Sequence, residues 1–117
     1  MSFQRMDADT AETLAGVVRL LRRAAELVWA AADSEGAGSF RQVLALGIDL
    51  VADEARNVLP DAIAVGGPVP VGDEPAGLLR SAEQLLRRID TPGAGAVHGL
   101  RARVADLVWE ANTGVDA

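Results

Sequence analysis

The chain has 117 residues, a length typical of one domain with its own apolar core. Half of its residues are hydrophobic, but only four are aromatic, so the core must be built mainly from Leu, Val, Ile and Ala. The absence of cysteine excludes disulfides and thiolate metal sites. The absence of lysine excludes Schiff-base chemistry and a lysine general base.

The charge of the chain narrows the classes of partner. A net charge of −6 argues against nonspecific nucleic-acid binding, because such binding depends on neutralising phosphates. All 11 basic residues are arginines, which with abundant Ala, Gly, Val and Asp indicates a GC-rich bacterial genome. No apolar run approaches the roughly 18 residues of a membrane span, and MSFQRMDADT at the start contains no signal-peptide core. We therefore expect a soluble, cytoplasmic protein.

Four segments carry apolar residues at spacings of three and four, the pattern of amphipathic helices. The helices are expected over residues 10–33, 39–59, 74–90 and 91–112. Pro60 ends the second helix, and Asp73 reads as the cap of the third, with Pro75 in its first turn. The sequence therefore predicts an all-α fold, a four-helix bundle in a single domain.

The second helix is expected to bury one face and expose the other. Its buried face is predicted to comprise Phe40, Val43, Leu44, Gly47, Ile48, Val51, Ala55 and Val58. Its solvent face is predicted to carry Gln42, Asp49, Asp53 and Arg56.

The link between the second and third helices, residues 60–73, is unusual because it is both broken by Pro and Gly and apolar. The other two links are short, which favours antiparallel neighbours. We therefore expect two helical hairpins, residues 10–59 and 74–113, joined by this long link. Its length is compatible with crossing the whole bundle or with folding back as a lid, so the topology stays open.

The two expected hairpins also resemble each other in sequence. LLRRAAELV (20–28) aligns with LLRSAEQLL (78–86), and VLALGIDLVADE (43–54) aligns with LRARVADLVWEA (100–111). Duplication of one hairpin would produce these matches, and so would a shared amphipathic pattern in Ala- and Leu-rich helices.

Residues able to carry chemistry are sparse. His98 is the only histidine and has no cysteine partner, so it is expected to be a polar surface residue. Asp49, Asp53, Asp106 and Glu110 could form a carboxylate cluster for Mg²⁺, but the same spacing is typical of a solvated face. We therefore predict no catalytic residue, no metal site and no cofactor.

Broad apolar stripes and an apolar link favour a non-enzymatic interaction protein. It would act as a homodimer or as a small accessory or regulatory subunit, and the expected contact residues are Ile63, Val65, Val69, Val71 and Trp109. One alternative is a small-molecule-binding or enzymatic bundle, in which residues 62–71 form a lid over an apolar pocket for an apolar or anionic ligand. A second alternative is a helical protein secreted by a specialised actinobacterial system, although the usual Trp-x-Gly turn is absent after Trp109.

Overall fold

The computed structural model describes residues 8–33, 40–59, 65, 70, 72–89 and 95–115. Every regular element in these ranges is a helix: α1 (Ala8–Ala32), α2 (Phe40–Val58), α3 (Pro75–Arg87) and α4 (Gly95–Val115). The prediction of an all-α chain with four helices is confirmed. The fourth helix continues to Val115, past the end expected at residue 112.

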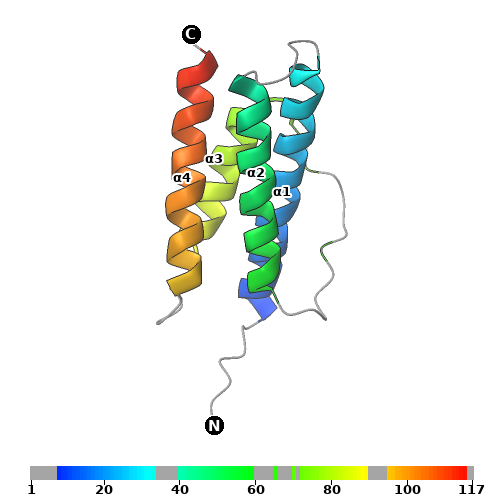
Figure 1. Ribbon diagram of the computed structural model, residues 1–117. Helices are drawn as coiled ribbons and strands as arrows, with labels where there is room; N and C mark the ends of the chain where they lie inside the picture. Colours follow the sequence, from blue (N-terminus) through cyan, green and yellow to red (C-terminus); the bar gives the residue numbers. More distant parts are fainter. Residues whose placement is uncertain are drawn as a thin grey trace.

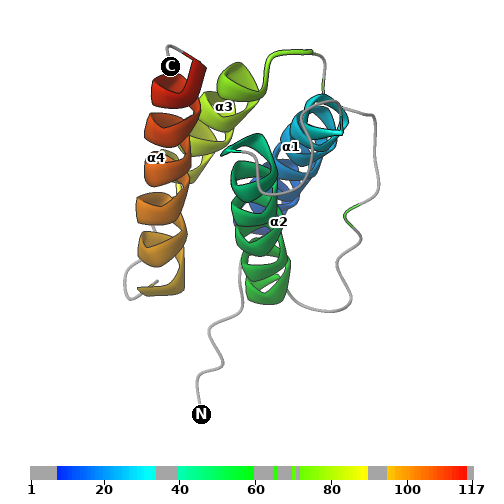
Figure 2. The same cartoon turned by 45° about the horizontal axis from the view of Figure 1, so that its top comes forward.

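The helices form a four-helix bundle in which α1 and α4 run in one direction and α2 and α3 in the other (Figures 1 and 2). α1 packs against α2 and α3, and α4 packs against the same two helices. Within the described ranges, α1 does not contact α4 and α2 does not contact α3, so these pairs lie on the diagonals. Each helix is therefore antiparallel to both of its neighbours.

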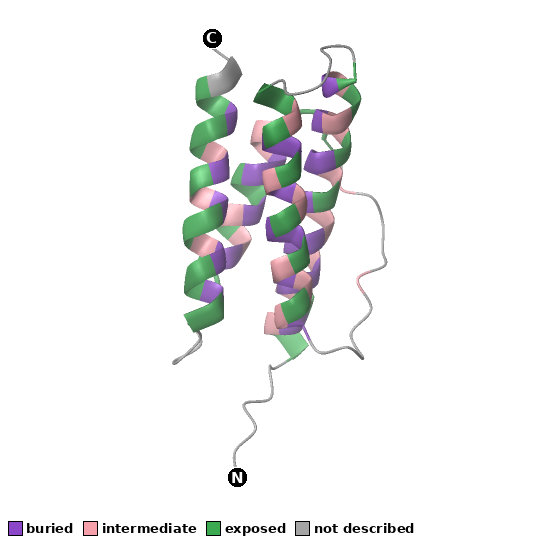
Figure 3. Ribbon diagram, viewed as in Figure 1, coloured by how far each residue is buried: buried purple, intermediate pink, exposed green. Residues whose placement is uncertain are grey.

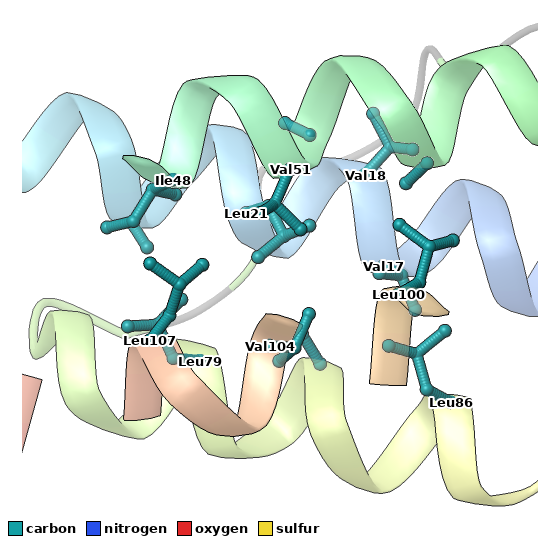
Figure 4. Packing of buried hydrophobic residues seen from close by; sticks show 14 of the residues in the cluster. Val17, Val18, Leu21, Ile48, Val51, Leu79, Leu86, Leu100, Val104 and Leu107 are labelled. Atoms are coloured by element: carbon teal, nitrogen blue, oxygen red, sulfur yellow. The ribbon is translucent and has the colours of Figure 1, made fainter. Parts of the chain in front are cut away.

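The core lies on the bundle axis and draws on all four helices. Figure 4 shows Leu21, Ile48, Leu79 and Val104, one from each helix, among the aliphatic side chains that meet there. Their exposed fractions are zero, and the burial pattern in Figure 3 follows the inner stripe of each helix. Among the described residues no charged or polar residue is fully buried, so the interior is held by aliphatic packing.

The start of α3 differs from the prediction in its capping residue. Glu74, not Asp73, occupies the N-cap position, and its side chain makes no capping hydrogen bond. Pro75 occupies the first turn, where its missing N–H leaves no unsatisfied donor. Gly72 precedes this start with a φ of 142°, a conformation that L-residues rarely adopt.

The end of α3 is stabilised by a side chain from α4. Arg101 donates from one guanidinium nitrogen to the carbonyl oxygens of Leu86 and Ile89, at 3.1 and 3.0 Å. Leu86 is in the last turn of α3, where the carbonyls carry the helix's negative partial charge, and Ile89 lies two residues past the end of the helix. Arg101 therefore caps α3 and ties it to α4 with one charged group.

Candidate interaction surface

The interaction residues predicted in the link are mostly outside the described residues, namely Ile63, Val69 and Val71. Val65 is described, and it packs partly buried against the core. Its carbonyl oxygen accepts a 3.3 Å hydrogen bond from Arg19, near the middle of α1. Both its side chain and its carbonyl therefore contact this chain's own bundle.

Trp109 is the other predicted contact residue, and 68% of it is exposed. A large aromatic ring in water is a typical feature of protein interfaces. Asp106 and Glu110 are also exposed on α4, three residues before and one residue after Trp109. Trp109 is therefore flanked by charged residues. Its backbone carbonyl accepts a hydrogen bond from the Thr113 hydroxyl within the same helix.

Among the described residues, the largest group of exposed apolar side chains lies on α2, and it was not predicted. Its members follow spacings of three and four residues, so they share one outer face of the helix. We call this group the α2 stripe: Phe40 (50% exposed), Val43 (62%), Leu46 (51%) and Leu50 (65%). These fractions are far above those of core residues, so the stripe is surface that no other described element covers.

The prediction that Phe40 and Val43 lie on the buried face of the second helix was wrong. The buried face is rotated toward α1 and includes Ala45 and Ala52, whose small side chains allow the two helices to approach closely. α2 carries two apolar stripes, and a single amphipathic pattern cannot distinguish the one that is buried. Leu46 and Leu50 could have revealed the second stripe, because both are apolar and neither belongs to the predicted buried face.

An ion pair joins α2 to α4 beside the α2 stripe. Glu54 follows Leu50 by one helical turn and pairs with Arg103 of α4. Two turns nearer the start of α2, Gly47 faces Leu107 of α4, and a Cβ on Gly47 would lie 3.4 Å from Leu107 Cδ2. These two contacts fix α4 alongside the same flank of α2.

Exposed acidic side chains lie beside the α2 stripe on both α2 and α4. Asp106 and Glu110 follow Arg103 by three and seven residues, so they share its face of α4, and both are exposed. Asp53 follows Leu50 by three residues on α2 and is exposed as well. The α2 stripe is therefore bordered by carboxylates on both helices.

A groove continues the stripe toward the end of α2. It has a volume of about 320 Å³ and lies between the C-terminal part of α2 and the N-terminal part of α4. We call it the α2–α4 groove; its walls are Glu54, Asn57, Val58, Ala96, Gly99, Leu100 and Arg103. Ala96 and Gly99 leave it open, because their side chains are small or absent.

The carboxylates considered for a metal site are not brought together. Asp49 accepts a 2.8 Å hydrogen bond from the Trp29 indole on α1, whereas Asp106 and Glu110 lie on α4, which α1 does not contact. In the described ranges, no three Asp, Glu or His side chains are arranged to hold a metal ion. His98 is exposed near the start of α4.

A second hollow, the end pocket, lies where α1 and α4 end and α2 and α3 begin. Its volume is about 290 Å³, and its walls include Leu27, Phe40, Leu44, Pro75 and Ala111. Arg41, Asp73 and Glu74 contribute polar groups. Val65 and Pro70, the two described residues of the expected lid of residues 62–71, are not among its walls, which on the α3 side are formed by residues 73–76.

Comparison with known proteins gave no relative: no family model, curated protein or solved structure matches this chain. None of the helices in the described ranges has the length and apolar character needed to cross a membrane.

Proposed function

We propose that this protein is a non-enzymatic helical interaction protein, which self-associates or serves as a small accessory or regulatory subunit. The observation that carries the proposal is the α2 stripe. Single exposed apolar residues are ordinary on protein surfaces, but a contiguous row on one helix face is typical of a contact site. Burying the exposed halves of four such side chains would stabilise a complex by roughly 3–6 kcal/mol.

The proposal is tested by comparing the intact protein with the variant Leu50→Glu. Sedimentation velocity over a wide concentration range reports self-association, and quantitative co-purification from the native host reports an accessory role. We expect Leu50→Glu to abolish whichever association the intact protein shows. Ala102→Glu is the control, because it adds the same charge at an exposed position of α4. Equal association by the intact protein and Leu50→Glu would refute the proposal.

We also propose that the bundle consists of two helical hairpins, α1–α2 and α3–α4, joined by the apolar link of residues 60–73. The packing of α1 on α2 and of α3 on α4 supports this arrangement. α2 ends at the opposite end of the bundle from the start of α3 (Figure 1). Fourteen link residues can extend about 45 Å, more than the roughly 28 Å length of α2, and Val65 beside the middle of α1 supports a path along that helix.

Small-molecule binding is the second candidate function, and the end pocket is the observation that favours it. Its volume approaches that of small ligand sites, and most of its walls are aliphatic. The amphipathic dye 1-anilinonaphthalene-8-sulfonate is a suitable probe. Binding to the folded protein, and its loss in Ala76→Trp, which would fill the pocket, would support this candidate. Unchanged dye binding in Ala76→Trp would exclude the pocket as the site.

We propose that the protein works in the bacterial cytoplasm, where its acidic, lysine-free surface would be one partner of an intracellular complex. Fractionation of the native host, followed by immunodetection, distinguishes the cytoplasm from the culture medium.

A further inference from the structure

We infer that the α2 stripe binds an amphipathic helix with basic flanks, supplied by another protein. This inference rests on the proposed interaction function and goes further by specifying the partner's chemistry. Three features of the surface support it: its shape, its length and its charge.

The shape of the surface suits a helix. Phe40, Val43, Leu46 and Leu50 lie along one outer face of α2, and the α2–α4 groove extends this face past Glu54. A helix that packs against such a row presents residues at spacings of three, four and seven. The α2–α4 groove has small wall residues at Ala96 and Gly99, so it offers room for a side chain near the end of the docked helix.

The length of the surface sets the length of the partner. From Phe40 to Asn57 there are 17 residue steps along α2, which correspond to about 26 Å at 1.5 Å per residue. A partner helix of roughly 18 residues covers this distance. The surface is one helix wide, whereas a stable interface between two folded copies commonly needs about 800 Å² from each. Two copies would have to bring their charged borders together to reach that area.

The charge on either side of the α2 stripe favours a partner helix over a second copy of this chain. In the described structure, Asp53, Glu54, Asp106 and Glu110 lie on this side of the bundle. The guanidiniums near them are Arg103, which pairs with Glu54, and Arg56, three residues after Asp53, so carboxylates outnumber guanidiniums here. A second copy would bring the same carboxylates against them, which is unfavourable. Lysine or arginine flanks on a partner helix would instead pair with Asp106 and Glu110 on one side and Asp53 on the other. The same field would speed the encounter with a basic partner.

Two synthetic helical peptides of roughly 18 residues test the inference. Both carry leucines at spacings of three and four, and their flanking residues are all Lys in one and all Glu in the other. Fluorescence anisotropy with the full-length protein measures their affinities at low salt. We expect the Lys-flanked peptide to bind more than about tenfold more tightly, to weaken as salt is raised, and to lose binding to Leu50→Glu.

A charge exchange provides the decisive comparison. The double variant Asp106→Lys, Glu110→Lys is expected to reverse the preference and bind the Glu-flanked peptide more tightly. Glu12→Lys, Glu83→Lys changes the net charge equally on α1 and α3 and is expected to keep the original preference, since Glu83 is on α3, which α2 does not contact. Circular dichroism confirms that each variant is folded.

Each other outcome overturns the inference. Equal affinities for the two peptides, no binding of either, or the same reversal in both double variants would show that the local acidic borders do not select the partner. If the intact protein dimerises and Leu50→Glu does not, while neither peptide binds, a second copy is the occupant. In that case the proposed interaction function stands and the basic partner helix is wrong. If Leu50→Glu changes no association at all, both fail.

Discussion

The indole nitrogen of Trp29 donates a 2.8 Å hydrogen bond to Oδ2 of Asp49, joining α1 to α2. The ring also packs against the apolar core, so one side chain contributes both a polar and an apolar contact. Hydrogen bonds to charged groups stabilise proteins more than those between neutral groups. This contact therefore stabilises the antiparallel packing of α1 against α2.

Replacing Trp29 with Phe should lower the free energy of unfolding by about 1–3 kcal/mol, because the partly buried Asp49 carboxylate loses its donor and the ring loses area. Urea denaturation followed by circular dichroism measures the change. Trp109→Phe is the matched control and should stay within about 0.5 kcal/mol of the intact protein, since Trp109 is exposed. Equal losses in the two variants would contradict the assigned roles.

Arg101 and Arg103, two residues apart on α4, should respond differently to the same substitution. Arg101→Gln removes the cap on the carbonyls of Leu86 and Ile89 and should cost about 1–3 kcal/mol of stability. Arg103→Gln removes a solvent-accessible pair with Glu54 and should cost less than about 1 kcal/mol. Thermal unfolding of both variants makes the comparison. A larger effect at Arg103 would show that the cap does not hold α3 and α4 together.

Truncation of a side chain on each of the two apolar faces of α2 should change stability by very different amounts. Ile48→Ala opens a cavity in the core and should destabilise the protein by about 2–5 kcal/mol. Leu50→Ala, two residues later, should change stability by less than about 0.5 kcal/mol, because Leu50 is exposed. Both values come from urea denaturation of the isolated protein. If Leu50→Ala were as costly as Ile48→Ala, the α2 stripe would be buried in solution.

Helical periodicity was enough to predict the four helices, because Leu and Val recur at helical spacing and Pro60 interrupts the pattern. It was not enough to orient α2. Val43 and Ile48 are both apolar at helical spacing, and only the positions of α1 and α4 decide which one is covered. The link residue Val65 was predicted as a contact, but the sequence does not reveal its hydrogen bond with Arg19, 46 residues away. Long-range packing thus determined the candidate site, whereas local pattern determined the helices.

Two glycines should give opposite responses to alanine. Gly72 has a φ of 142°, and a Cβ there would lie 3.3 Å from Leu78 Cδ2, so Gly72→Ala should cost about 1–3 kcal/mol. Gly99 lies inside α4, where an added Cβ would meet open space, so Gly99→Ala should stabilise by roughly 0.5–1 kcal/mol. Melting temperatures should therefore move in opposite directions. A shift of the same sign in both would refute the assigned backbone geometry.

The proposed pair of hairpins predicts that the bundle survives a cut in its link. With a protease site inserted between Gly66 and Gly67, cleavage should leave the two halves associated, because α1 packs on α3 and α2 on α4 across the hairpin boundary. The cut removes the intramolecular link, so the stability of the cleaved protein should rise with its concentration, unlike that of the uncut protein. Size-exclusion chromatography and thermal unfolding at several concentrations measure both effects. Separation of the halves into folded monomers, or concentration-independent stability after cleavage, would show that the hairpins do not complete one another's core.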